Sequence, residues 1–284
     1  MAQRERVSPD AILVGNGSDE LIRDLLLVYG GPGTRTVFPA PTFSMYRQLT
    51  MATGGTPVGV RLRPDWSLDD EMFATELHHS ASRLAFIASP NNPTGNAFDY
   101  EDLQKLVAET DRLVVLDEAY GLFAERDLRG LREAYPQVVT LKTFSKSMSL
   151  AGVRLGYLVA DPEVIRLLDR VRLPYNVDAL AQAVACRALD HGEIWEAQAQ
   201  RVKAERERLN VRLQAVAELT VFPSQANFLL VRHPRAAVLK AALAAQGVAV
   251  RSFGNTEGLE NCLRLTVGTP EENDRLLGVF SAGK

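Results

Sequence analysis

The chain has 284 residues, of which 46% are hydrophobic and 24% are charged, and this composition is typical of a soluble globular protein of about two domains. Thirty-two basic and thirty-five acidic side chains give a formal charge of −3, which argues against a nucleic-acid-coating protein, because such proteins carry a basic excess. No apolar run reaches the roughly 18 residues of a membrane-spanning helix. Residues 1–6 carry charge but no apolar stretch, so we do not expect them to form a secretory signal. We therefore expect a cytoplasmic protein whose two cysteines, Cys186 and Cys262, are reduced and mostly buried.

The first part of the chain alternates short apolar runs with amphipathic stretches. Such alternation predicts an α/β fold with a mostly parallel sheet that is flanked by helices. The predicted strands are residues 11–15, 35–38, 56–60, 83–89, 112–116, 138–142 and 154–160, and the clearest helices are 19–29, 43–52, 99–109 and 161–170.

The character of the chain changes after Pro174. Residues 178–217 are rich in helix-forming side chains and predict two long helices that are split near His191. Strands at 220–222, 227–231, 248–251 and 262–267 follow, with a helix at 236–246 and a terminal helix that begins after Thr269. We expect a larger α/β domain over residues 1–174 and a smaller C-terminal α+β domain over residues 175–284.

Polar residues follow four of the predicted strands. In open α/β sheets, ligands bind beyond the carboxyl ends of the strands. Taken singly, each group has an ordinary structural explanation, such as a helix cap at 18–19 or a turn at 92–95. Their ordered combination predicts a site that comprises a glycine-led helix start at 17–19, an amide at Asn92, a carboxylate and tyrosine at Asp117 and Tyr120, and Lys146 beside Ser145 with Arg154 beyond.

These residue types suit one kind of cofactor. Free N–H groups of the turn at 17–19 can bind a phosphate, and Ser145 and Arg154 can complete the cup. Lys146 in a pocket would have a lowered pKa and could form a Schiff base. Asp117 at the end of a buried strand needs a cationic partner, such as a protonated ring nitrogen. Together these features indicate pyridoxal phosphate.

The combination of motifs resembles the fold-type-I pyridoxal-phosphate aminotransferases, and most closely the histidinol-phosphate aminotransferases. The resemblance extends from near the start of the chain to its end. The matching segments are GNGSDE at 15–20, APTFSMY at 40–46, NNPTG at 91–95, DEAY at 117–120, TFSK at 143–146, LAGVRLGY at 150–157, VRLPYNV at 171–177, ANF at 226–228 and NCLRLTVGT at 261–269.

The resemblance implies a role for each matching residue. Lys146 would form the Schiff base, Asp117 would pair with the ring nitrogen, and Tyr120 would bind the ring hydroxyl oxygen. Asn92 would share that oxygen and border the substrate, and Phe43 would stack on the ring, where many relatives carry tyrosine. The resemblance also implies a phosphate cup of Gly17, Ser18, Asp19, Ser145 and Arg154, a substrate-carboxylate arginine at Arg264 and a substrate-phosphate arginine at Arg251.

The implied activity is transamination between histidinol phosphate or imidazole-acetol phosphate and glutamate or 2-oxoglutarate, a reaction of histidine biosynthesis. The implied partners are small molecules and a second copy of the chain, with no metal, nucleic acid or membrane. Alternatives are an aromatic amino-acid aminotransferase, a phosphothreonine decarboxylase, or a cofactor-binding protein without turnover. A nucleotide-binding module using the turn at 15–20 fits poorly, because Glu20 breaks the GxGxxG pattern.

The start of the chain departs from the family pattern. Fourteen residues precede Gly15, whereas family members have several tens more, including an arm that closes over the substrate and a tyrosine that reaches the partner's cofactor phosphate. Three explanations of this start stay open: a truncated chain, a late start codon or a natural shortened form. In each case we expect the cofactor site to be intact and the activity to be reduced. Adding an upstream arm is expected to raise turnover.

Overall fold

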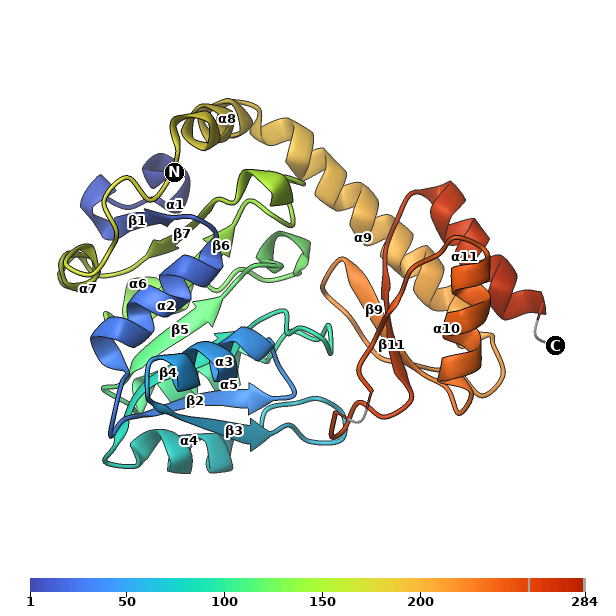
Figure 1. Ribbon diagram of the computed structural model, residues 1–284, viewed down its shortest axis with the longest axis horizontal. Helices are drawn as coiled ribbons and strands as arrows, with labels where there is room; N and C mark the ends of the chain where they lie inside the picture. The colour runs from blue at the N-terminus through green and yellow to red at the C-terminus, as the bar shows by residue number, and fades with distance from the viewer. Residues whose placement is uncertain (255, 283–284) are drawn as a thin grey trace.

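A large mixed sheet dominates the computed structural model, which describes residues 1–254 and 256–282 (Figure 1). Within these residues the sheet has seven strands in the order β1-β7-β6-β5-β4-β2-β3. Neighbours pair in parallel except at β7, which is antiparallel to both β1 and β6, so β1 runs in the same direction as β6. The strands are β1 (Ile12–Gly15), β2 (Arg35–Ala40), β3 (Thr56–Arg61), β4 (Ser82–Ala88), β5 (Leu113–Asp117), β6 (Val138–Thr143) and β7 (Gly156–Val159).

Helices cover both faces of this sheet. The inner strands β4, β5, β6 and β7 are buried on both sides and therefore read as continuous apolar runs, whereas the edge strand β3 is mostly exposed or half-buried. In β5, Leu113 and Val115 pack into the core under one set of helices, and Val114 and Leu116 pack into the core under the other. The first set is α2 (Ser18–Tyr29), α3 (Ser44–Ala52) and α7 (Pro162–Asp169), and the second is α4 (Asp70–His78), α5 (Tyr100–Ala108) and α6 (Arg129–Ala134).

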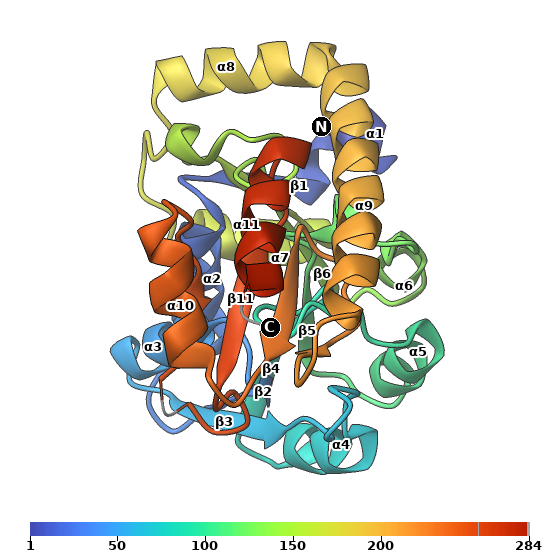
Figure 2. The ribbon, with the colours of Figure 1, turned by 90° about the vertical axis from the view of Figure 1, so that its right-hand side faces the viewer.

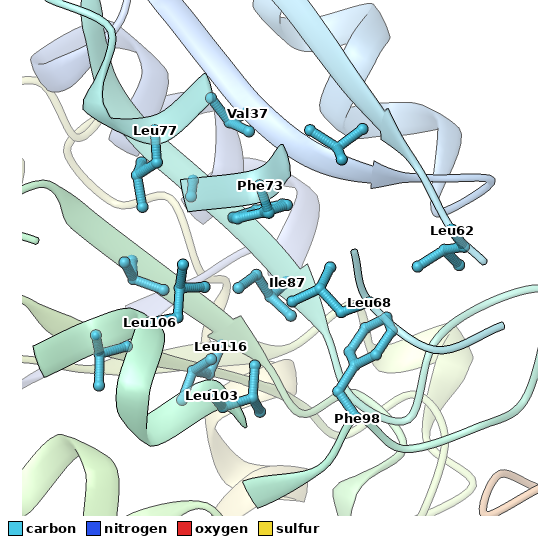
Figure 3. Close-up of a cluster of buried hydrophobic side chains, with 14 of the residues drawn as sticks. Val37, Leu62, Leu68, Phe73, Leu77, Ile87, Phe98, Leu103, Leu106 and Leu116 are labelled. Carbon is cyan, nitrogen blue, oxygen red and sulfur yellow. The ribbon is translucent and has the colours of Figure 1, made fainter. Parts of the chain in front are cut away.

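Figure 3 shows the core between the sheet and the second set of helices. Phe73 of α4 and Leu103 of α5 lie against Ile87 of β4 and Leu116 of β5, and all four side chains are fully buried. Side chains of this size each contribute roughly 1.5–3 kcal/mol when they are removed from water. The three-layer packing therefore holds the carboxyl ends of the strands as a rigid edge.

A second, smaller sheet lies to one side of the large one (Figures 1 and 2). Among the described residues it has four strands, in the order β10-β11-β9-β8, and each neighbouring pair is antiparallel. Helix α9 runs from the region of the large sheet to the small sheet. The elements of this part are α8 (Ala179–Asp190), α9 (Gly192–Gln214), β8 (Thr220–Val221), β9 (Phe228–Arg232), α10 (Ala236–Ala245), β10 (Arg251–Ser252), β11 (Cys262–Thr266) and α11 (Pro270–Ala282), and the short helix α1 (Ala2–Glu5) opens the chain.

The predicted α/β class is confirmed, and two local expectations are wrong. The strand expected at 248–251 begins only at Arg251, because Val248 and Val250 pack into the core of the small sheet without strand pairing. Both cysteines are free, but only Cys262 is buried. Cys186 is exposed, because it lies on a side of α8 that faces away from the core.

The domain boundary after residue 174 stays a prediction. Helix α8 follows that boundary, yet its Ala181 and Ala185 pack with Leu155 and Tyr157 of the larger part. No helix in residues 1–254 and 256–282 combines the length and the apolar character needed to cross a membrane.

Candidate active site

A pocket lies at the carboxyl edge of the large sheet, where β4, β5 and β6 end and α2 begins. The site predicted from the sequence came from segments that are far apart in the chain. The structure brings nine of its residues together as lining of this pocket: Ser18, Asp19, Phe43, Asn92, Asp117, Tyr120, Ser145, Lys146 and Arg154.

One end of the pocket is suited to an anion. The first N–H groups of α2 have no partner within the helix, and the positive end of the helix dipole faces the same way. Gly17 precedes the helix with a φ of +80°, and a Cβ atom there would come within 2.6 Å of Nη2 of Arg154. Only glycine therefore lets the guanidinium approach this turn. Nη2 of Arg154 also lies 3.4 Å from Oδ2 of Asp19, so the arginine stands beside the helix start.

Asp117 is the last residue of β5 and is 5% exposed. Its Oδ1 accepts a hydrogen bond from the N–H of Ala119 at 2.9 Å, and its Oδ2 accepts one from the hydroxyl of Tyr46 at 2.6 Å. Burial raises the pKa of Asp117, whereas these two hydrogen bonds act in the opposite direction. Among the described residues no cation lies within ion-pair distance of this carboxylate, although Lys146 acts on it from farther away, and a protonated ring nitrogen would supply a direct partner.

Tyr46 has no role in the site predicted from the sequence. It was part of the segment at 40–46, but nothing in that segment showed which residue would contact Asp117. A usable signal is its spacing from Phe43, since residues three apart near the start of a helix lie on the same side. The ring of Tyr46 meets that of Phe43 edge-on, with centroids 5.6 Å apart.

Lys146 follows β6, and its Nζ lies 5.8 Å from the centre of the Tyr120 ring. Burial of its amine lowers its pKa, and the positive charge of Arg264 lowers it further. Asp117 lies in the same pocket and raises it, but the net direction is downward. A lowered pKa increases the fraction of neutral amine, which is the nucleophilic form.

The two predicted substrate arginines are placed differently. Nη1 of Arg264 in β11 donates a hydrogen bond to Oδ1 of Asn92 at 2.5 Å, and its guanidinium carbon lies 4.9 Å from the centre of the Phe228 ring. This contact joins the small sheet to the loop after β4. Arg251 in β10 is directly opposite Arg264 in the strand pairing and is exposed. Neither arginine lines the pocket itself, and Arg264 is joined to it through Asn92.

The pocket fits pyridoxal phosphate in each part of the cofactor. The helix start, Ser145 and Arg154 offer donors for a phosphate, and the buried carboxylate of Asp117, held by neutral donors, suits a protonated ring nitrogen. Phe43 offers an aromatic face, and Lys146 offers an amine of lowered pKa. In the part of the chain that the structure describes, no three His, Cys, Asp or Glu side chains gather as metal ligands.

Comparison with known proteins gives a family match over almost the whole chain. The family model described as aminotransferase class I and II matches residues 3–280. The chain belongs to this family. A curated relative, histidinol-phosphate aminotransferase 2 of Nitrosococcus oceani, is 41% identical to this aminotransferase over 276 residues, which cover 96% of this chain and 76% of the relative.

Solved structures agree with this membership. Histidinol-phosphate aminotransferase from Sinorhizobium meliloti, solved in complex with pyridoxal-5'-phosphate, superimposes with a TM-score of 0.89 at 25% identity, covering 100% of this chain and 80% of that one. A decarboxylase from Sulfurospirillum multivorans reaches the same TM-score of 0.89 at 27% identity and covers 100% of this chain and 85% of that one. The fold is thus shared by relatives that carry out different reactions.

Proposed function

We propose that this aminotransferase uses pyridoxal 5'-phosphate to move an amino group between histidinol phosphate and 2-oxoglutarate, with imidazole-acetol phosphate and glutamate as the other pair. The observation that carries the proposal is that Lys146 and Asp117 line one pocket together with Ser18 and Asp19 at the start of α2. The identity of 41% to a relative named for this reaction supports the choice of substrate.

Different residues of the pocket would bind different parts of the cofactor. The N–H groups of Ser18 and Asp19, together with Ser145 and Arg154, would bind its phosphate. Phe43 would stack on its ring. Tyr120 and Asn92, which also line the pocket, would bind the ring oxygen.

The chemistry depends on two proton-holding groups. When bound, the cofactor supplies a ring that accepts the electrons left behind when the Cα proton of the amino substrate departs. The carboxylate of Asp117 would keep a proton on the ring nitrogen. Nζ of Lys146 would accept the Cα proton as general base and later donate it as general acid. The lowered pKa of Lys146 favours the neutral amine that the first step needs.

Substrate binding is assigned to the two arginines of the small sheet. Arg264 reaches the pocket through Asn92, so its guanidinium can bind the α-carboxylate of glutamate in a paired geometry. Arg251 is its cross-strand neighbour on the same face of the sheet, where it can meet the phosphate of histidinol phosphate. One pocket can then accept a dicarboxylate and a phosphate ester in turn.

An assay with three substrates tests this function. Purified protein loaded with the cofactor should transfer an amino group from histidinol phosphate to 2-oxoglutarate, and transfer from phenylalanine should be at least tenfold less efficient in kcat/KM. Release of carbon dioxide from phosphothreonine should be absent. Preferred turnover of phenylalanine or phosphothreonine would assign the chain to a different reaction, and cofactor binding without turnover of any of the three would contradict the proposal.

We also propose that the protein forms a homodimer. Three large apolar side chains, Leu173, Tyr175 and Leu180, are at least half exposed around the start of α8, and a second copy would cover them. Sedimentation equilibrium should report twice the chain mass, and Tyr175→Asp combined with Leu180→Asp should shift the protein to the monomer. A wild-type protein that stays monomeric at micromolar concentration would contradict this.

A further inference from the structure

Tyr46 is a fully buried tyrosine that contacts two parts of the proposed cofactor site. Its hydroxyl donates to Oδ2 of Asp117 at 2.6 Å. Its ring stacks on Phe86 of β4, with centroids 4.8 Å apart and an angle of 5° between the planes, and it also meets Phe43 edge-on. Packing on two aromatic rings leaves the hydroxyl little freedom to point elsewhere.

The carboxylate of Asp117 is thus held from two sides. The N–H of Ala119 donates to Oδ1, and the hydroxyl of Tyr46 donates to Oδ2. These two neutral donors restrict rotation of the carboxylate and stabilise its charged form. The other charged groups that act on it are Asp19 at the start of α2 and Lys146 after β6, which have opposite effects on its pKa. The pKa of Tyr46 itself is raised well above its usual value by burial and by Asp117, so its hydroxyl keeps its proton and remains a donor.

We propose that Tyr46 is a positioning residue that orients the Asp117 carboxylate toward the cofactor's ring nitrogen and keeps the shared proton on that nitrogen. This inference rests on the proposed use of pyridoxal phosphate. A hydrogen bond donated to a carboxylate lowers its basicity, so the proton between the two groups stays on the nitrogen. Without the donor, the carboxylate competes more strongly for the proton, and the ring accepts electrons less readily.

The test compares two tyrosine-to-phenylalanine variants. Tyr46→Phe keeps the ring and its packing and removes only the hydroxyl. Tyr157→Phe is the matched control, because Tyr157 is also buried and its hydroxyl also donates to a carboxylate, Oε1 of Glu5, at 2.8 Å. That bond lies outside the pocket lining. A general effect of losing a buried hydroxyl would appear in both variants.

The first measurement needs no cofactor. Carbon-13 NMR of the carboxyl groups in aspartate-labelled apoprotein follows the titration of Asp117, identified by its absence in Asp117→Asn. The pKa of Asp117 should rise by about one unit in Tyr46→Phe, since a hydrogen bond to a charged group is worth roughly a tenfold change in an equilibrium. It should stay within about 0.2 units of wild type in Tyr157→Phe. Equal shifts in both variants, or none in Tyr46→Phe, would overturn the inference.

The second measurement uses cofactor labelled with nitrogen-15 in the ring. The ring-nitrogen signal should be that of a protonated nitrogen in wild type and Tyr157→Phe, and should move toward the unprotonated position in Tyr46→Phe. The kcat for amino transfer should fall about tenfold in Tyr46→Phe with little change in the KM for glutamate, because the hydroxyl that is removed bonds to Asp117 and not to the arginines assigned to the substrate.

The two proposals fail in different ways. If wild-type protein does not bind pyridoxal phosphate, the proposed function and this inference both fall. If wild type and both variants bind the cofactor and the ring nitrogen gives the same signal in all three, the proposed function stands and Tyr46 has only a packing role.

Discussion

Asp117 and Glu118 are neighbours in the chain, but their carboxylates lie in different surroundings. Asp117 points into the pocket, where its partners are the neutral donors of Tyr46 and Ala119. Glu118 points away from the pocket lining, and its Oε2 lies 4.0 Å from Nζ of Lys142. Both side chains are buried, at 5% and 8% exposure, so the difference between them is the type of partner rather than the degree of burial.

The surroundings of Glu118 already contain cations. Nζ of Lys142 donates to Oε1 of Glu5 at 3.0 Å, and the hydroxyl of Tyr157 donates to the same oxygen. Burial would raise the pKa of Glu5, but Lys142, Tyr157 and Arg132 together hold it below its usual value. Burial outweighs the nearby cations at Glu118 and raises its pKa to about 7. In the pocket, by contrast, Lys146 acts on Asp117 only from beyond ion-pair distance among the described residues, and a protonated ring nitrogen would supply a direct partner.

The largest expected effect is loss of the lysine in the pocket. Lys146→Ala should lower kcat by about 10⁴-fold or more, because the variant lacks both the amine that carries the cofactor and the proton-transfer group. Lys142→Ala is the control, because Lys142 lies beside Glu5 and Glu118 and outside the pocket lining. This variant should keep kcat within about threefold of wild type and should have a lower melting temperature. Steady-state kinetics and thermal unfolding of both variants make the comparison. Near-normal turnover by Lys146→Ala would remove the basis of the mechanism.

The next largest effect should separate the two neighbouring acids. Asp117→Asn should lower kcat by about 10²-fold, because an amide cannot hold a proton on the ring nitrogen. Glu118→Gln should change kcat by less than about threefold. The measurement is kcat at saturating glutamate and cofactor. Equal losses of kcat in the two variants would contradict the assignment of a catalytic role to Asp117 alone of the two acids.

A third comparison concerns two arginines. Arg264→Gln should raise the KM for glutamate by roughly 10–100-fold, the worth of a charge-assisted hydrogen bond to a carboxylate. Arg132→Gln should leave that KM unchanged and should lower the free energy of unfolding, because Nη2 of Arg132 donates to the carbonyl oxygen of Glu5 in a buried position. Kinetics and urea unfolding of the two variants separate binding from stability. A stability loss without a KM change in Arg264→Gln would show that Arg264 only joins the two sheets.

The smallest effect is a pH dependence of stability set by Glu118. Its pKa of about 7 in the folded protein lies above the usual value of 4.5, so the folded state binds a proton that the unfolded state releases between these values. This acid therefore makes the free energy of unfolding fall as pH rises from about 4.5 to about 7. Glu118→Gln should remove that contribution and be more stable than wild type at pH 8 by about 1–2 kcal/mol. Urea unfolding at pH 5 and pH 8 measures it, and parallel curves for the two proteins would contradict the assignment.

The sequence predicts the strand ends well because burial on both faces forces long apolar runs, and polar residues after those runs mark the edge of the sheet. It cannot predict the Tyr46–Asp117 hydrogen bond or the contact of Glu5 with Lys142, because each joins segments far apart in the chain whose distance depends on packing. The late start of β10 has a related cause. Val248 and Val250 have the apolar side chains expected of a strand, but they pack against the core of the small sheet without pairing with another strand.

The assignment of Lys146 is tested most directly by reduction with borohydride. Protein incubated with pyridoxal 5'-phosphate and then reduced should gain one covalently bound cofactor, and peptide mass spectrometry should locate it on Nζ of Lys146. The same peptide should carry no label in Lys146→Arg, which lacks that amine. Label spread over surface lysines, or none on the peptide that contains Lys146, would contradict the central claim that this pocket is a pyridoxal-phosphate site.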